Sequence, residues 1–190
     1  MAHKTGNREE RAARAVTALL RALDVPLDHN TRETPARVAR MYAREVFAGL
    51  YEPRPRLTAF PNVKLLDQLY IVGPVAVRST CAHHLAPIIG RAWLGILPTG
   101  RILGLSKFSR LTRWVMSRPQ MQEEATSMLA DEVANAIRPD GLAVVVRATH
   151  LCMSWRGVLE HEAEMTTSVM RGSFLESPSL RAEFMALVKL

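Results

Sequence analysis

The sequence predicts an α+β domain built around an antiparallel sheet. Some segments repeat apolar residues at spacings of three and four, which indicates helices. Others are short apolar or β-branched runs bounded by turn formers, which indicates strands. The expected order is two helices, two strands, two helices, two strands and a final helix, and this grouping is typical of α+β folds. A chain of 190 residues fits one domain with a core large enough to be stable alone.

The N-terminal region, residues 1–50, is expected to be helical. Apolar residues recur with helical spacing over 8–23. A second helix should begin with Thr34 as its N-cap and Pro35 as its first helical residue. A stretch rich in proline and turn formers follows and connects this region to the unit 51–190.

The rest of the chain supplies the sheet and its helices. A turn of proline, aspartate and glycine precedes the most β-branched run, which is typical of a buried strand. The expected elements are strands at 69–77, 88–97, about 142–153 and about 163–170, and helices at 106–116, from Pro119 through Ile137, and from Ser177.

A Cys-x-x-His motif connects the first two strands. A tight turn would bring Cys81 and His84 onto one cation, and Cys152 would add a third ligand if the fold returns there. Thiolate and imidazole ligands select zinc or a similar borderline-soft ion. Three protein ligands leave one position open for water, as in a catalytic site. His83 and His150 remain beside the metal as proton carriers, so the motif predicts a hydrolytic zinc centre.

The two cysteines also have simpler interpretations, a disulfide or a pair of inert core thiols. The first fourteen residues are charged throughout and do not resemble a secretory signal. Reducing compartments rarely keep disulfides. The sequence therefore favours a cytoplasmic protein with a metal site.

The net charge of +7 and the pI near 10.1 suggest a polyanionic partner. The basic residues are spread along helices, without a basic run or interleaved aromatic residues, so nucleic acid is not the expected partner. A solvated surface and a pocket for a small polyanion both fit. No apolar run approaches the length of a membrane span, so no membrane partner is expected.

Several longer motifs follow one another in an order and with gaps that are specific to one family. They are Cys81-Ala82-His83-His84, Gly104-Leu105-Ser106-Lys107, Phe108-Ser109-Arg110, Arg118-Pro119-Gln120-Met121-Gln122-Glu123, Thr149-His150-Leu151-Cys152, Arg156-Gly157, Thr166-Thr167-Ser168 and Arg181-Ala182-Glu183-Phe184. With these motifs the chain resembles the GTP cyclohydrolase I family along nearly its whole length.

The resemblance implies a fold, an assembly and a reaction. The family has the tunnelling fold, in which subunits join their sheets into a ring, and two pentameric rings usually stack into a homodecamer with active sites at subunit interfaces. Residues 51–190 would form the catalytic tunnelling-fold domain. The family reaction converts GTP to 7,8-dihydroneopterin triphosphate and formate, the first step of pterin and folate biosynthesis, with Zn²⁺ as the cofactor.

The resemblance also assigns the catalytic residues. It makes Cys81, His84 and Cys152 the zinc ligands. His83 would be the general acid at the purine N7, and His150 would assist ring opening and the later ribose steps. A further residue, Ser106, opens a helix whose free N–H groups suit an anion, and is counted with the catalytic residues.

Substrate recognition is divided between the base and the phosphates. Glu123, with Gln122 beside it, matches the family's guanine readers. Without the resemblance, this glutamate would be a solvent-facing residue at a helix start. Positions that match the family's phosphate-binding cations are Lys107, Arg110 and Arg156, together with Arg37 and Arg40, which a neighbouring subunit would contribute.

Three positions depart from the family pattern. Ala82 stands where the family usually has glutamate, Glu124 where it has arginine, and Arg171 where many members are uncharged. The first two changes could be one compensated ion-pair swap. They could instead favour a modified guanine nucleotide as substrate, or stop the reaction at the formamide stage. A basic protein with structural zinc and a nucleic-acid partner is the remaining alternative, which the retained His83 and His150 disfavour.

Overall fold

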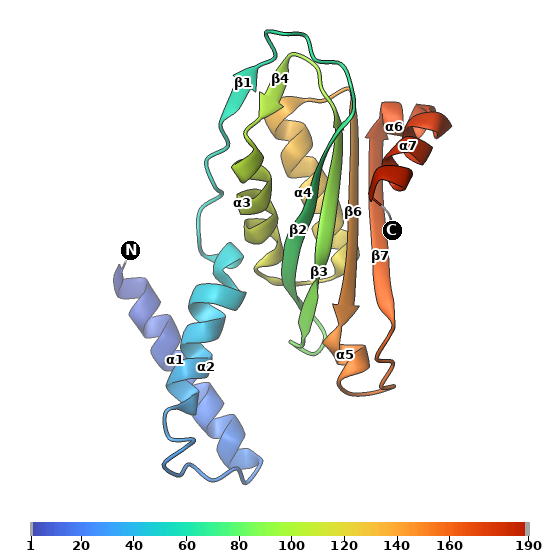
Figure 1. Cartoon of the computed structure of the whole chain (residues 1–190). Helices are drawn as coiled ribbons and strands as arrows, with labels where there is room; N and C mark the ends of the chain where they lie inside the picture. The colour runs from blue at the N-terminus through green and yellow to red at the C-terminus, as the bar shows by residue number, and fades with distance from the viewer. Residues whose placement is uncertain (1, 189–190) are drawn as a thin grey trace.

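The computed structural model describes residues 2–188, with side chains from residue 8 onward. Its centre is a five-stranded sheet in the order β5-β2-β3-β6-β7 (Figure 1). The four long strands pair antiparallel, and the short β5 pairs parallel with the end of β2. The mixed α and β composition and the mostly antiparallel sheet agree with the prediction. The strands are β2 (Tyr70–Cys81), β3 (Pro87–Leu97), β5 (Pro119–Gln120), β6 (Gly141–His150) and β7 (Glu164–Gly172).

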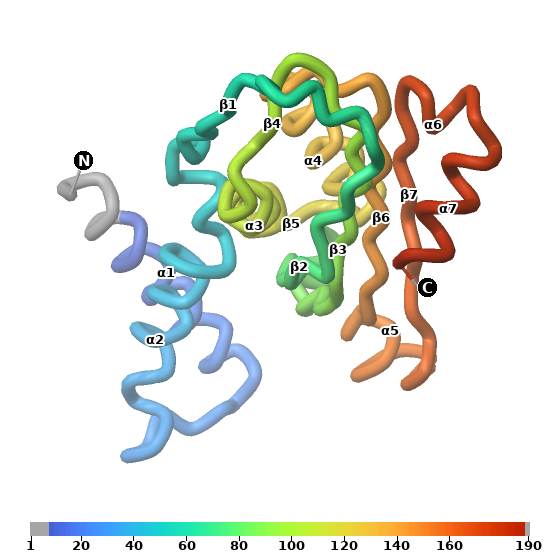
Figure 2. Tube along the Cα trace, turned by 45° about the horizontal axis from the view of Figure 1, so that its top comes forward, coloured from blue at the N-terminus to red at the C-terminus, as the bar shows by residue number. Residues whose placement is uncertain are grey.

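Helices cover both faces of this sheet. On one face, α3 (Leu105–Met116) and α4 (Gln122–Ile137) bury a large cluster that includes Phe108 and Leu129. On the other, α6 (Ser173–Glu176) and α7 (Pro178–Val188) bury a smaller cluster around Phe174 and Phe184. The N-terminal and C-terminal helices lie on opposite sides of the sheet (Figures 1 and 2).

Strand β6 contributes to both clusters. Val144 and Val146 face the large cluster, and Ala143 and Val145 face the small one; all four are fully buried. Each buried valine removes apolar surface from water, which stabilises the fold by about 1.5–3 kcal/mol. Burial on both faces explains the continuous apolar sequence that marked this strand.

The N-terminal region contains α1 (Ala2–Ala22) and α2 (Thr34–Met41). They are linked by an ion pair between Glu9 and Arg44 at 2.6 Å, and Arg44 belongs to a π-helical turn that continues α2. The N-cap of α2 is Glu33, so the prediction of Thr34 as the cap was wrong, although Pro35 lies in the first turn as expected. Because Thr34 is the first helical residue, it does not occupy the cap position.

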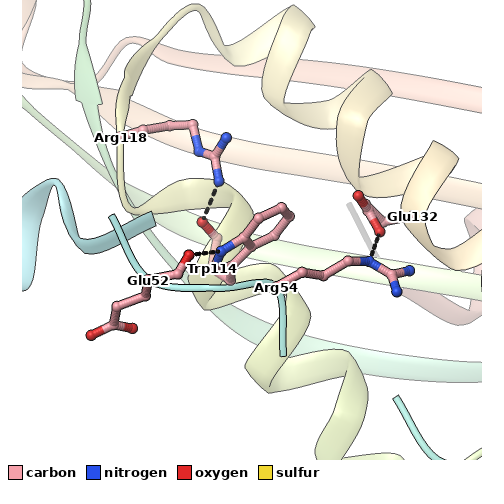
Figure 3. Close-up of polar contacts among 5 residues, drawn as sticks. All are labelled: Glu52, Arg54, Trp114, Arg118 and Glu132. Atoms are coloured by element: carbon pink, nitrogen blue, oxygen red, sulfur yellow. Dashed lines mark hydrogen bonds and ion pairs between the residues drawn. The ribbon is translucent and has the colours of Figure 1, made fainter. Parts of the chain in front are cut away.

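The connecting segment after residue 50 is attached to the helices of the large cluster (Figure 3). The indole of Trp114 donates to the backbone carbonyl of Glu52 at 3.1 Å, and Arg54 forms an ion pair with Glu132. Arg118 lies over the Trp114 ring and donates to the carbonyl of Trp114 at 3.1 Å. This segment therefore packs against α3 and α4 instead of hanging between two units.

Several element boundaries differ from the prediction. Strand β2 continues to Cys81, four residues beyond its expected end. Strand β6 stops at His150, and the next residues form a short helix, so Cys152 lies on a helix. Pro119 begins the parallel strand β5, and α4 starts only at Gln122. A short ribbon was not predicted; it consists of β1 (Ala59–Pro61) and β4 (Arg101–Leu103).

Candidate active site

The three predicted metal ligands lie at one end of the sheet. Cys81 is the buried last residue of β2, and its backbone pairs with Ala86 and Leu85 across the tight β2–β3 connection. This turn brings His84 back beside Cys81. Cys152 lies on α5 (Leu151–Ser154), which follows β6 directly. Because β6 and β3 are paired at this end, with His150 opposite Ile88, α5 begins close to the β2–β3 connection.

The ligand atoms of Cys81, His84 and Cys152 lie within 4.8 Å of one another. The Sγ of Cys81 is 3.9 Å from Nδ1 of His84. A tetrahedral zinc ion would hold such atoms about 3.6–3.8 Å apart, given its usual bond lengths. Both cysteines are free thiols. Burial raises the pKa of Cys152, and the adjacent Cys81 raises it further. A divalent cation binds the deprotonated thiols and so works against this rise in pKa. The ligand types and their spacing fit a borderline-soft divalent cation.

His83 lies next to this cluster without belonging to it. Its Nδ1 is 4.0 Å from the Sγ of Cys81, and its ring stands edge-on to that of His84. The side chain is exposed. It is thus free to meet a substrate held at the cluster.

Arg156 contacts the cluster from the loop after α5. Its Nη1 is 3.3 Å from Nε2 of His84. A guanidinium only donates hydrogen bonds, so Nε2 accepts here and the neutral ring carries its proton on Nδ1. A metal bound through Nδ1 needs the other tautomer. Metal binding at that atom would therefore break the contact between Arg156 and His84.

His150 is held from the other side by Gln122. The Nε2 of His150 is 2.8 Å from Oε1 of Gln122. Burial lowers the pKa of His150, and the nearby charge of Glu123 opposes this effect. Glu123 itself is exposed in the first turn of α4. The structure thus brings both histidines and this carboxylate to the end of the sheet that holds the metal ligands.

Five other predicted residues lie elsewhere. Lys107 is on α3, nine residues before Met116, which is about 14 Å along a helix axis. The Met116 end of α3 leads into β5, which pairs with Cys81, whereas the Lys107 end adjoins the β1–β4 ribbon. Among the described residues, no hydrogen bond joins the metal cluster to Ser106, Lys107 or Arg110 on α3, or to Arg37 or Arg40 on α2.

Two of the three residues that depart from the family pattern, Glu124 and Arg171, make contacts that account for them locally. The carboxylate of Glu124 accepts from the backbone N–H of Met121 at 3.5 Å and so caps α4. Arg171 forms an ion pair with Asp131 at 2.6 Å, which ties β7 to α4. Ala82 is exposed in the β2–β3 connection. Nothing in the structure pairs position 82 with position 124 within the described chain.

One part of the site was not anticipated. The hydroxyl oxygens of Thr126 on α4 and Thr167 on β7 lie 2.7 Å apart, next to Gln122. Thr126 also donates to the backbone carbonyl of Gln122 at 2.7 Å. Thr167 belongs to the Thr166-Thr167-Ser168 motif, to which the sequence alone assigns no role. Only the three-dimensional structure identifies this network, because Thr167 lies 41 residues from Thr126 in the sequence.

The comparison with protein families agrees with this geometry. The family described as GTP cyclohydrolase I matches residues 12–189. The chain belongs to the GTP cyclohydrolase I family. It is 44% identical over 184 residues to a GTP cyclohydrolase 1 of Streptomyces griseus, covering 95% of this chain and 90% of the relative. A Corynebacterium aurimucosum GTP cyclohydrolase 1 is 41% identical over 183 residues, with 95% and 93% covered.

A Vibrio vulnificus GTP cyclohydrolase 1 is 37% identical over 180 residues, covering 94% of this chain and 83% of the relative. Among solved structures, the crystal structure of an archaeosine synthase QueF-Like in the apo form matches with a TM-score of 0.42 and 16% identity, covering 63% of this chain and 97% of that one.

Membership of the GTP cyclohydrolase I family makes the chain an enzyme, a hydrolase of that family. The Cys-His-Cys cluster could bind a metal ion, which is consistent with membership of this family. None of the described helices combines the length and the apolar character that a membrane crossing requires.

Proposed function

We propose that this protein converts GTP to 7,8-dihydroneopterin triphosphate and formate, with zinc as its cofactor. One observation carries the proposal. Cys81, His84 and Cys152 converge to within 4.8 Å, while His83 and His150 lie beside them as histidines that are not needed as ligands. A purely structural zinc site has no use for these two histidines. The family membership supplies the substrate class.

The metal would be held by the two thiolates and the imidazole. When bound with one open position, zinc acts as a Lewis acid and brings the pKa of a water molecule close to neutral. His83, exposed beside Cys81, has the position of a proton donor to N7 of the imidazole ring when C8 is attacked. His150 would move protons during ring opening and the ribose rearrangement.

Glu123 is the proposed guanine reader. Its exposed carboxylate lies close enough to His150 to influence that ring electrostatically. A carboxylate accepts from the ring N–H and the amino group of guanine together. Adenine presents no such pair of donors and would leave the carboxylate unsatisfied, which selects against it.

The phosphates would be bound by cations from more than one subunit. Arg156 adjoins the metal cluster, whereas Lys107 lies toward the other end of the sheet and Arg110 lies midway along α3. The sheet has open edges that suit ring formation, because β5 pairs with only two residues of β2 and β7 has no outer partner among the described strands. These features support a tunnelling-fold homodecamer, with Ser106, Lys107, Arg110, Arg37 and Arg40 acting at neighbouring sites.

We place the enzyme in the cytoplasm, since its two ligand cysteines must stay reduced to bind metal. The decisive test is to incubate zinc-loaded protein with GTP and to follow formate and the fluorescent oxidised pterin. Both products are expected. Consumption of GTP without formate would show that the reaction stops at the formamide stage. No consumption of GTP, with turnover of a modified guanine nucleotide instead, would overturn the choice of substrate.

A further inference from the structure

Gln122 is a nearly fully buried polar residue beside His150, with 3% of its surface exposed. The family resemblance pairs it with Glu123 as a reader of guanine. Its carboxamide, however, is surrounded by protein groups. Its Nε2 lies 3.0 Å from the carbonyl oxygen of Met165, 3.1 Å from Oγ1 of Thr167 and 3.2 Å from the carbonyl oxygen of Val146.

These neighbours determine which way the carboxamide faces. Backbone carbonyls only accept hydrogen bonds, so the NH₂ group must point at Val146 and Met165. The amide oxygen then points the other way, at Nε2 of His150, 2.8 Å distant. Two N–H groups facing three acceptors leave no donor free for a base.

The surrounding hydroxyls lock this orientation. Thr126 gives its proton to the backbone carbonyl of Gln122 at 2.7 Å. Thr167, 2.7 Å from Thr126, must then donate to the Thr126 oxygen, and it accepts from the Gln122 amide. Each hydrogen bond in this network therefore has only one possible donor and one possible acceptor. Because Thr126 is fully buried and Gln122 nearly so, water cannot easily replace these bonds.

The amide oxygen accepts and does not donate, so Nε2 of His150 must carry a proton. In the neutral ring, Nδ1 is then the nitrogen with the free lone pair. Within the described residues, no protein group is bonded to that Nδ1. We infer that Gln122 is a positioning residue, which holds His150 as the Nε2–H tautomer and presents Nδ1 as the proton acceptor at the active site.

This inference rests on the proposed function for its consequence, because it names the atom through which His150 would move protons. It also changes the expected recognition of the base. With its carboxamide committed to His150 and the sheet, Gln122 does not read guanine through its side chain. Discrimination between purines falls on Glu123, which is exposed on the same turn of α4.

The first test needs no turnover, and it uses a variant only to assign the signals. Zinc-loaded protein labelled with ¹⁵N only at histidine is studied by solid-state NMR, and the His150→Ala spectrum identifies the signals of His150. We expect a protonated Nε2 and an unprotonated Nδ1. A ring with its proton on Nδ1 and a bare Nε2 would overturn the inference. If the protein failed to turn over GTP, this spectrum would still decide the tautomer, so the two failures are distinguishable.

The second test uses a matched pair of variants. Gln120 is another buried glutamine, two residues away, whose amide donates to the carbonyl of Val115 and to Ser79 and does not contact His150. Gln122→Met should lower kcat about 10- to 100-fold, the usual effect of losing a partner that orients a functional histidine. The KM for GTP should change little, and the His150 signals should report mixed tautomers. Gln120→Met should lose stability to a similar extent but keep kcat within about twofold.

Zinc content is measured for both variants, to exclude loss of metal as the cause. A Gln122→Met variant with an unchanged kcat and a KM raised about tenfold or more would mean that Gln122 reads the base. An equal fall of kcat in both variants would mean that Gln122 has only a structural role. Either result would refute the positioning role.

Discussion

The separation of Lys107 from the metal cluster leads to a quantitative prediction about shared sites. Cys81 ends β2 beside β5, whereas Lys107 lies about 14 Å back along α3, at the end that adjoins the β1–β4 ribbon. If each active site takes its metal half from one chain and its phosphate half from another, a Cys81→Ala chain and a Lys107→Ala chain carry complementary defects. Mixing them should restore activity.

The size of the recovered activity follows from the fraction of sites that combine two intact halves. Cys81→Ala should abolish turnover, and Lys107→Ala should weaken GTP binding about 10- to 100-fold, because a charge-assisted phosphate contact contributes about 1.5–3 kcal/mol. In a randomly mixed equimolar oligomer, half of the metal halves and half of the phosphate halves are intact. About one site in four then combines two intact halves, so activity at limiting GTP should reach about a quarter of the wild-type value.

The assay follows formate release after the two variants have been dissociated and reassembled together, with native mass spectrometry confirming that subunits have exchanged. A matched control mixes Cys81→Ala with His83→Ala. Both residues belong to the metal half of the site in one chain, so no pairing of halves restores a site and no activity should return. If exchange is proven and the Lys107→Ala mixture gains nothing over its parents, each chain builds its own phosphate site and the reasoning fails.

Three further predictions concern the metal cluster. Cys152→Ala should lose bound zinc and turnover together, measured by elemental analysis and formate release; full activity without metal would contradict this. His83→Ala should keep its zinc but lose kcat about 100-fold or more, because only a proton carrier is removed; loss of zinc would make His83 a ligand. Arg156→Ala should raise zinc affinity about 2- to 10-fold by removing a hydrogen bond that competes with the metal, while weakening GTP binding. Zinc affinity that stays the same or falls would exclude such competition.

Sequence periodicity was sufficient to predict the four long strands of the sheet and the helices that cover it, because burial determines the apolar pattern of both, but it did not reveal the short strand β5. The run around Val144 is buried on both faces of β6, and the spacing from Ala125 to Ile137 is the buried face of α4. Periodicity does not locate boundaries where side chains alone give no signal. Leu151 and Met153 are apolar residues that fit a strand or a helix equally well. Only the structure shows that the chain leaves the strand after His150 and forms the short helix α5.

The chemistry of the site was predictable in part. Cys81, His84 and Cys152 could be singled out as candidate metal ligands because cysteine and histidine are distinctive ligand types, and the structure brings the three together. The surroundings of Gln122 were not predictable, since its partners Met165 and Thr167 are 43 and 45 residues away. The same residue type can read a base or orient a histidine, and only the acceptors around its amide distinguish these roles.

The pairing of β3 with β6 has a consequence for how the metal is acquired. Ten residue pairs align these strands, and the pairing ends with His150 opposite Ile88, two residues before Cys152. The ligands are therefore brought together by a sheet whose core is apolar and needs no ion. In zinc-finger domains the ion drives folding, but here the fold should come first and loading second. Chelators should then inactivate the enzyme reversibly, with hydrogen exchange increasing at the β2–β3 connection and α5 while the amides of β6 stay protected.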